Sequence, residues 1–170
     1  SLRSRAELLT GLDESDAEDA YSQVALRADA AALIDRLREA GHTVAIFTGG
    51  FERGVQRALE ADDTAVDRIV SNRLPIADGE LTGEVEGPLI EGTKDDQLKE
   101  LAAELGVEMS DTIAVGDGAN DLPMLEVAGL AVGFEPKPAV QASCDEVVST
   151  MDALGTLLEG RGVLAAAVDD

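Results

Sequence analysis

Apolar positions along the chain alternate between helical spacing and short unbroken runs. Within residues 29–41, Leu33 and Leu37 lie one helical turn apart, and a glycine ends the segment. The unbroken apolar run at residues 43–48 follows directly, and such a run is typical of a strand buried on both faces. The pattern therefore predicts a helix and then a buried strand.

The same alternation continues to residue 159. Further helices are expected at 4–12, 13–25, 51–61, 93–106, 121–129, 137–143 and 152–159, and further strands at 68–74, 112–116, 130–134 and 146–149. Residues 74–86 predict a β-hairpin with Asp78-Gly79 at its turn. Helices that alternate with short buried strands predict an α/β fold, with a parallel sheet and helices on both faces.

The net charge of −22 changes the range of expected partners. Such a chain repels nucleic acid and anionic membrane, and no apolar run approaches the ~18 residues that span a bilayer. The acidic residues are spread along the chain and only three lysines occur, which resembles cytoplasmic proteins of salt-loving organisms. A single cysteine excludes an internal disulfide and suits a reducing compartment, so we expect a cytoplasmic protein.

Two of the predicted strands end in polar, glycine-rich segments. In α/β folds, ligands bind beyond the carboxyl ends of the strands. Thr48, Gly49 and Gly50 offer a hydroxyl and unhindered N–H groups at a helix N-terminus, which can hold a phosphate. An ordinary strand-to-helix turn is the alternative interpretation of these three residues.

The second polar end, "GDGAND", carries two carboxylates. Asp117 and Asp121 offer hard oxygens for Mg²⁺. Helix capping is the alternative, and it accounts for Asp121 but not for Asp117, which stands between two glycines. Lys94 opens the helix at 93–106, where a cation is slightly unfavourable; it is either a solvated surface lysine or a functional group.

Four parts of the sequence carry a family resemblance. In order and with suitable spacing, "TVAIFTGGF", "IVSNRLPIADGELTGEVEGP", Lys94 and "TIAVGDGANDLPMLEVAGLAVGFEPKP" resemble the phosphoserine phosphatases of the haloacid dehalogenase superfamily. The motif GDGxND after a strand is specific to that superfamily. The resemblance implies a Rossmann-like core at 28–160, which includes the hairpin, a remnant of a small helical cap at 1–27, and a loose tail at 161–170.

The resemblance also implies a reaction and a set of site residues. Members of the family hydrolyse O-phosphoserine to serine and phosphate, the last step of serine biosynthesis, through an aspartyl-phosphate intermediate and with Mg²⁺. Thr48 and Gly49 match the phosphate cradle, with threonine where the family usually has serine. Lys94 matches the lysine that offsets the phosphoryl charge.

Four further positions match the family's site. Asp117 matches a Mg²⁺ ligand, and Asp121 matches a supporting acid near the metal. Asn120 matches a substrate contact. Arg5 matches an arginine of the cap that binds the substrate carboxylate, a task that suits the two parallel donors of a guanidinium. Phosphoserine is therefore the expected small-molecule partner.

One part of the family pattern is absent from these 170 residues. The family begins with a strand that ends in Asp-x-Asp, which supplies the nucleophile and the general acid/base; the acidic stretch "LDESDAED" follows no strand and does not match. In the family that strand lies at the centre of the sheet, between the strands that match 43–48 and 112–116. We therefore expect the central first strand to be missing and residues 1–170 alone to be inactive.

Two other functions stay open on the sequence. One is a different small-molecule phosphatase of the same superfamily, since one arginine does not decide the substrate. The other is a non-catalytic domain that binds Mg²⁺ or phosphate, and the absent motif supports it. An in-frame "FDxDxT" upstream of Ser1 in the DNA would indicate truncation, and its absence would favour the non-catalytic domain.

Overall fold

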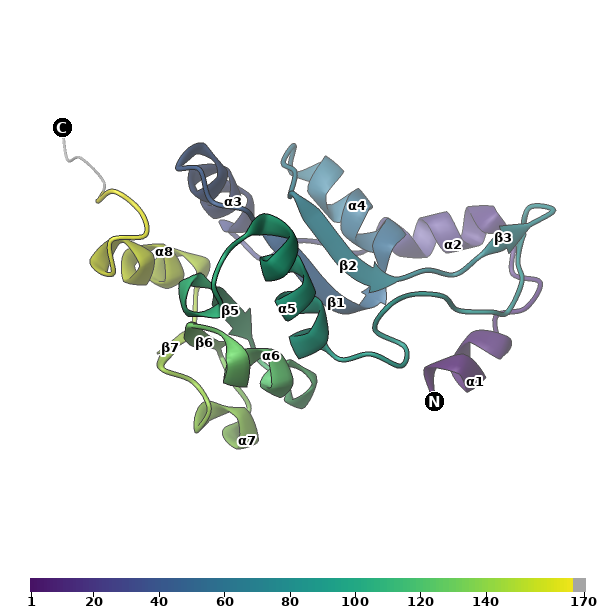
Figure 1. The fold of residues 1–170 in the computed structure, drawn as a ribbon. Helices are drawn as coiled ribbons and strands as arrows, with labels where there is room; N and C mark the ends of the chain where they lie inside the picture. Colours follow the sequence, from purple (N-terminus) through teal and green to yellow (C-terminus); the bar gives the residue numbers. More distant parts are fainter. Residues whose placement is uncertain (167–170) are drawn as a thin grey trace. The chain divides into compact units, whose positions relative to one another are not determined.

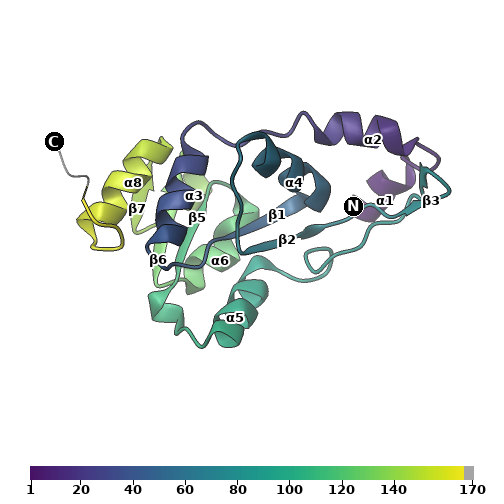
Figure 2. The same cartoon turned by 90° about the horizontal axis from the view of Figure 1, so that it is seen from above.

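The computed structural model describes residues 1–166 of the chain (Figures 1 and 2). The chain divides into two compact units, Ser1–Glu91 and Gly92–Asp170. The domain boundaries predicted at residues 27 and 160 stay predictions.

The first unit is an α/β arrangement around one parallel strand pair and a hairpin. Its elements are α1 (Leu2–Glu7), α2 (Glu14–Tyr21), α3 (Ala30–Glu39), β1 (Ala45–Phe51), α4 (Glu52–Ala61), β2 (Arg68–Asn72), β3 (Ile76–Ala77) and β4 (Glu80–Leu81). Strands β1 and β2 pair in parallel, and helix α4 connects them and packs against both. Strands β3 and β4 form the predicted hairpin, with Asp78 and Gly79 at φ of 53° and 77° at its turn.

Strand β1 extends further than the sequence predicts. Glycine weakens strands, so residues 49 and 50 were expected to end this one, but it continues to Phe51. Phe47 pairs with Val70 and Phe51 pairs with Asn72, so four residue steps on β1 correspond to two on β2. The polar residues between Phe47 and Phe51 therefore lie in a bulge of the strand, and not in a turn after it.

The second unit contains a three-stranded parallel sheet. Its elements are α5 (Lys94–Leu105), the 3₁₀ turn η1 (Met109–Asp111), β5 (Ile113–Gly116), the 3₁₀ turn η2 (Ala119–Asp121), α6 (Leu122–Val127), β6 (Leu130–Phe134), α7 (Pro138–Gln141), β7 (Glu146–Val148) and α8 (Met151–Gly160). The strand order is β5-β6-β7. Helices α5 and α6 lie on one face of this sheet and α8 on the other, as predicted for an α/β fold (Figure 2).

The core of the second unit is mostly aliphatic. Every residue of the central strand β6 is buried, and Val132 and Val140 have no exposed surface. Leu164 is also buried, and its N–H donates to the carbonyl of Leu158, so the start of the predicted loose tail packs on α8. The last part of that tail, 167–170, lies outside the described residues.

Within the described residues, both end strands of each parallel sheet have one unpaired edge, and β1 and β5 are among them. Within residues 1–166, β1 pairs with β2 alone and β5 pairs with β6 alone. On β5, Ile113 and Val115 are each 37% exposed, although both are apolar. These are the two strands beside which the missing central strand is expected, and its place there stays a prediction.

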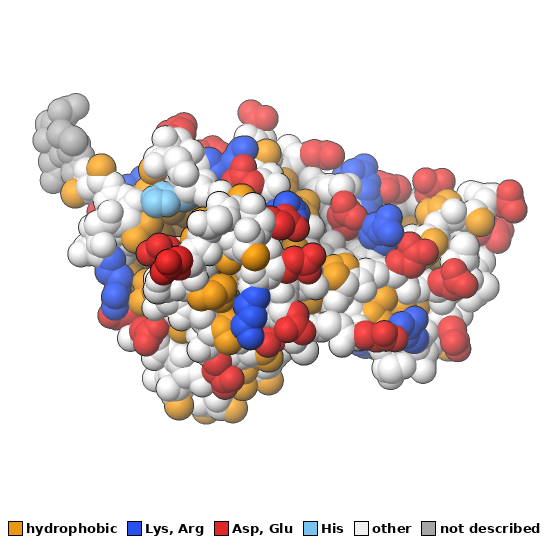
Figure 3. Space-filling view, in the orientation of Figure 1, with side chains coloured by type: hydrophobic (Ala, Val, Ile, Leu, Met, Phe, Trp, Pro, Cys, Tyr) orange, Lys and Arg blue, Asp and Glu red, His pale blue; other side chains and the backbone are white. Residues whose placement is uncertain are grey.

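The surface carries the acidic composition of the chain. Figure 3 shows acidic side chains scattered over the visible face, with lysine and arginine between them. None of the helices in the described part of the chain has the length and hydrophobicity needed to cross a bilayer.

Candidate functional site

Lys94 is a buried residue that forms an ion pair. Its Nζ lies 2.6 Å from Oδ1 of Asp121, and the two side chains are 9% and 8% exposed. A buried charge is costly unless it is paired and hydrogen-bonded. The interpretation of Lys94 as a solvated surface lysine is therefore excluded, and helix α5 delivers its ammonium group to the end of strand β5.

Asp121 organises the loop that follows β5. Its Oδ2 accepts hydrogen bonds from the N–H groups of Asp117 at 2.9 Å and Gly118 at 3.2 Å. Burial alone would raise the pKa of Asp121, but the hydrogen bond from Lys94 and those from the two N–H groups outweigh burial and hold this pKa below its ordinary value. The carboxylate is therefore ionised at neutral pH and fixes the loop.

Gly116 makes this close packing possible. A Cβ at Gly116 would lie 2.5 Å from the Cβ of Asp121 and 2.6 Å from its Oδ2. No larger residue fits there without moving Asp121, because real Cβ atoms do not approach other atoms so closely. The first glycine of "GDGAND" is thus required by the side chain five residues later.

Asp117 is the carboxylate of this loop that fits a metal ion. It is exposed, and its side chain has no hydrogen-bond or ion-pair partner in the described part of the chain. Both oxygens of Asp121 are already engaged, which suits a supporting role and not direct ligation. Residues 1–166 contain no group of three His, Cys, Asp or Glu placed to hold a metal, but Mg²⁺ often binds through one or two carboxylates and several waters. Asp117 therefore fits one ligand of such an ion.

The predicted phosphate cradle, Thr48 to Gly50, lies in the bulge of β1. Gly49 and Gly50 are exposed and Thr48 is half-buried. The Gly50 N–H donates to Thr48 Oγ1 at 3.0 Å, and a Cβ at Gly49 would meet nothing within 4 Å. The segment thus offers exposed backbone and one hydroxyl, which already accepts from the Gly50 N–H. Its role as a phosphate cradle stays a prediction.

Asn72 holds the cradle from the neighbouring strand and was missed by the sequence analysis. It is 1% exposed, and its Nδ2 donates to the Gly49 carbonyl at 3.1 Å. Gly87, at φ 147°, packs so closely that a Cβ there would lie 2.4 Å from Asn72 Oδ1. That oxygen is buried without a hydrogen-bond partner among the described residues. Polar residues at the carboxyl end of a buried strand, here Ser71 and Asn72, are the signal that could have found it.

Arg5 and Asn120, the two remaining predicted substrate contacts, are exposed. The side chain of Arg5, on α1, has no hydrogen bond or ion pair within residues 1–166, whereas Arg3 on the same helix pairs with Glu91. The guanidinium of Arg5 is therefore available to a carboxylate that the described residues do not supply.

The predicted residues thus form two separate groups, one in each unit. Hydrogen bonds link Lys94, Asp117 and Asp121 in the second unit. In the first unit, Gly49 is linked to Asn72 and Thr48 to Gly50. That both groups face one edge of a common sheet stays a prediction.

Comparisons of the chain with known proteins agree on one family. Residues 2–126 match the family model of haloacid dehalogenase-like hydrolases. The chain is 53% identical over 163 residues to a phosphoserine phosphatase of Halobacterium salinarum, covering 96% of this chain and 77% of that protein. A crystal structure of a phosphoserine phosphatase in apo form superposes with a TM-score of 0.81 at 37% identity, covering 92% of this chain and 78% of the other. A phospho-aspartyl intermediate analogue of phosphoserine phosphatase also has a TM-score of 0.81, at 34% identity, covering 92% and 75%.

Proposed function

Because the chain belongs to the haloacid dehalogenase-like hydrolases, we propose that it acts in the hydrolysis of O-phosphoserine to serine and phosphate through an aspartyl phosphate. The observation that carries this proposal is the buried Lys94–Asp121 pair beside the glycine loop of β5. A buried cation next to an open, exposed carboxylate is the arrangement that phosphoryl transfer needs for its negative charge.

Lys94 has capacity left for a phosphoryl group. An ammonium has three donors, and Asp121 accepts from one of them. The remaining donors are held in a buried position, where hydrogen bonds to charged oxygens are stronger than in water. Lys94 would therefore stabilise the charge of the transferring phosphoryl group while Asp121 fixes the position of the ammonium.

Asp117 would hold Mg²⁺, and Asp121 would fix the loop that carries Asp117. When bound, the ion offsets negative charge on the phosphoryl oxygens. Asn120, exposed on η2, would contact the substrate. The hydrogen bonds from the N–H groups of Asp117 and Gly118 to Asp121 fix the backbone that carries these side chains.

Thr48 and Gly49 would bind phosphate oxygens through the hydroxyl and the backbone, and Arg5 would bind the substrate carboxylate. Support for the second role is that the side chain of Arg5 has no hydrogen-bond or ion-pair partner in the described residues. A guanidinium pairs with a carboxylate through two parallel hydrogen bonds, which would select an amino-acid substrate over a simple phosphomonoester.

The nucleophile is the part of this mechanism that residues 1–170 do not contain. No strand in the sequence ends in Asp-x-Asp. We propose that catalysis needs such a strand in addition to these residues, and the unpaired edges of β1 and β5 support this. The 170 residues alone are then expected to be inactive.

The acid-rich composition and the single cysteine support a cytoplasmic place in a salt-rich cell. The same charge supports a small-molecule partner and argues against nucleic acid or membrane.

The test uses residues 1–170 preceded by a segment that ends in an Asp-x-Asp strand, called the extended chain below. With Mg²⁺, its kcat/KM for phosphoserine should exceed that for phosphoethanolamine, which lacks the carboxylate, by about tenfold or more. Arg5→Gln should remove this preference, because the carboxylate loses its partner.

Arg3→Gln is the matched control, since Arg3 lies on the same helix but forms an exposed pair with Glu91. Equal turnover of both substrates by the extended chain would favour another small-molecule phosphatase. Absence of turnover with every phosphomonoester would favour a non-catalytic domain.

A further inference from the structure

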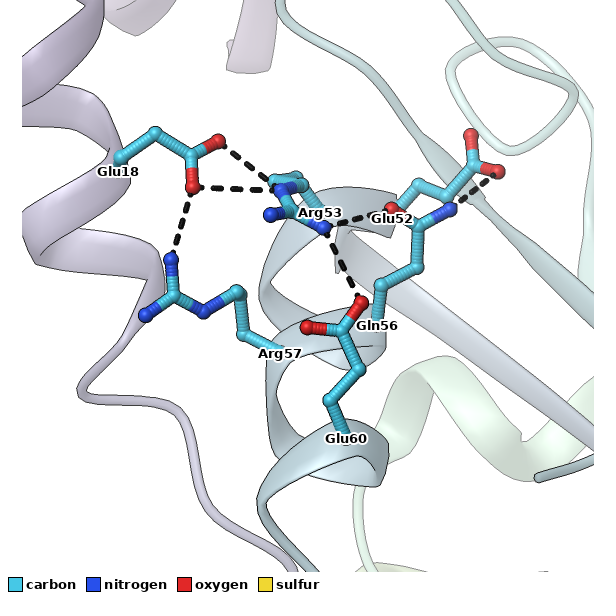
Figure 4. Close-up of polar contacts among 6 residues, drawn as sticks. All are labelled: Glu18, Glu52, Arg53, Gln56, Arg57 and Glu60. Atoms are coloured by element: carbon cyan, nitrogen blue, oxygen red, sulfur yellow. Dashed lines mark hydrogen bonds and ion pairs between the residues drawn. The ribbon is translucent and has the colours of Figure 1, made fainter. Parts of the chain in front are cut away.

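Helix α2 contacts the first two turns of α4 through one carboxylate and two guanidinium groups (Figure 4). Glu18 Oε1 accepts from Arg53 Nε at 2.9 Å, and Glu18 Oε2 accepts from Arg57 Nη1 at 2.9 Å. Arg53 and Arg57 are one turn apart on α4. A single side chain from α2 therefore binds two successive turns of another helix.

The bound end of α4 follows the phosphate cradle directly. Strand β1 ends at Phe51 and α4 begins at Glu52, so only these two residues separate Gly50 from Arg53. The cradle lies in the bulge of β1, just before the N-terminus of this helix. A shift of the first turn of α4 would therefore reach the cradle through two intervening residues.

Two apolar contacts accompany the ion pairs at the same end of α4. The ring of Tyr21 packs edge-on against that of Phe51, with centroids 6.4 Å apart. A Cβ at Gly54 would lie 2.9 Å from a methyl carbon of Val24, so the two segments approach as closely as glycine allows. Residues 51, 53 and 54 are thus all contacted by α2 or by the residues that follow it.

The other polar contacts of Arg53 come from α4 itself. Its Nη1 lies 3.5 Å from Gln56 Oε1 and 3.5 Å from Glu60 Oε1, both at the limit for a hydrogen bond. Among the described residues, Glu18 is the only partner of Arg53 from another element. The hydrogen bonds from Arg53 and Arg57 also lower the pKa of Glu18, so this carboxylate stays ionised at neutral pH.

We propose that Glu18 is a positioning residue for the phosphate cradle. It acts through Arg53 and Arg57, which fix the N-terminal turn of α4 and so the geometry of Gly49 and Gly50. This inference rests on the proposed function, since it assigns the cradle to phosphate. It predicts that Glu18 affects phosphate affinity although it does not touch the substrate.

The experiment compares Glu18→Gln with Asp19→Asn in the extended chain. Both variants remove one negative charge from α2, but the exposed Asp19 side chain has no partner within residues 1–166. Glu18→Gln should raise KM for phosphoserine and Ki for inorganic phosphate by about fivefold each, with kcat changed less than about twofold. Asp19→Asn should change neither constant.

Two more readouts separate positioning from a general loss of structure. Arg53→Gln should raise KM to a similar extent, and the double variant should not exceed the larger single effect, because both act through one contact. The increase in KM should also diminish in molar KCl, because salt screens partly exposed pairs. A lower melting temperature with unchanged KM and Ki, or equal effects of Glu18→Gln and Asp19→Asn, would overturn the proposal.

Hydrogen exchange in residues 1–170 gives a test that needs no activity. Glu18→Gln should speed exchange of the amides from Gly49 to Gly54, and Asp19→Asn should not. Unchanged exchange in Glu18→Gln would overturn the positioning role. Faster exchange in a protein whose extended chain hydrolyses no phosphomonoester would instead show that the proposed function fails while Glu18 still fixes this helix end.

Discussion

The polar end of β5 and the polar end of β1 are organised by different kinds of side chain. At β5, an ionised pair less than a tenth exposed, Lys94 and Asp121, fixes the loop. At β1, the neutral carboxamide of Asn72 donates to the carbonyl of an exposed glycine, and the ion pair nearby, Glu18 with Arg53, is partly exposed. The first end depends on buried charge, and the second depends on backbone shape.

Each end also has a glycine that packs against its buried polar side chain. Gly116 lies against Asp121, and Gly87 lies against Asn72. In both places the backbone comes close enough to a buried polar side chain to prevent its movement. At both ends a glycine therefore packs against a buried polar side chain, and this side chain is ionised only at the β5 end.

Removing the buried charge at the β5 end should have the largest effect on stability and activity. Lys94→Met leaves Asp121 buried without its cation, which should lower the free energy of unfolding by about 3–5 kcal/mol in urea titrations. In the extended chain it should also lower kcat by about two to three orders of magnitude. Lys99→Met is the control, because Lys99 is exposed and lies 4.0 Å from Asp95; its effect should stay within about 0.5 kcal/mol. Equal effects of the two variants would show that burial of Lys94 is unimportant.

Adding one methyl group beside each organising side chain should have the next largest effect. Gly116→Ala and Gly87→Ala should each lower the free energy of unfolding by about 1–3 kcal/mol, because a Cβ overlaps Asp121 or Asn72. Gly49→Ala, where a Cβ meets no atom within 4 Å, should change stability by less than about 1 kcal/mol. Urea titration of the three variants distinguishes these cases. A stable Gly116→Ala protein would mean that the loop moves freely around Asp121.

Acid should weaken the β5 end specifically. The pKa of Asp121 is lowered in the folded protein, so its contribution is fully present above the unfolded pKa of about 3.9 and is lost as pH falls through the lower folded value. The free energy of unfolding should therefore fall less steeply below about pH 4 in Asp121→Asn than in the unmodified chain. Asn72→Ala, at the neutral β1 end, should leave this slope unchanged. Parallel slopes for Asp121→Asn and the unmodified chain would contradict the assignment.

A change of salt concentration should have the smallest effect at the buried β5 end. The Debye length falls from roughly 30 Å at 0.01 M to about 3 Å at 1 M, so the melting temperature should rise with KCl as the repulsion within a chain of net charge −22 is screened. The destabilisation caused by Lys94→Met should be similar at 0.1 and 2 M KCl, because buried pairs are screened little. A melting temperature that is flat across this range would count against adaptation to high salt.

Most of the helices and strands could be predicted from the sequence, because they follow from local sequence signals. The hairpin turn at Asp78-Gly79 and the glycine at the end of α5 follow from residues adjacent in the chain. The bulge in β1 could not be predicted in the same way, because it depends on the register with β2 and on Asn72. Burial of Lys94 likewise depends on Asp121, 27 residues away, so the lysine alone left its role open.

In the proposed mechanism, residues 1–170 supply the groups of a phosphoserine phosphatase that bind phosphate and metal and stabilise charge, without its nucleophile. Phosphate release from phosphoserine, measured in molar KCl with Mg²⁺ for residues 1–170 and for the extended chain, tests this mechanism. We expect no release by residues 1–170, turnover by the extended chain, and loss of that turnover in Asp117→Ala. Robust release by residues 1–170 alone, or near-normal turnover by Asp117→Ala in the extended chain, would contradict it.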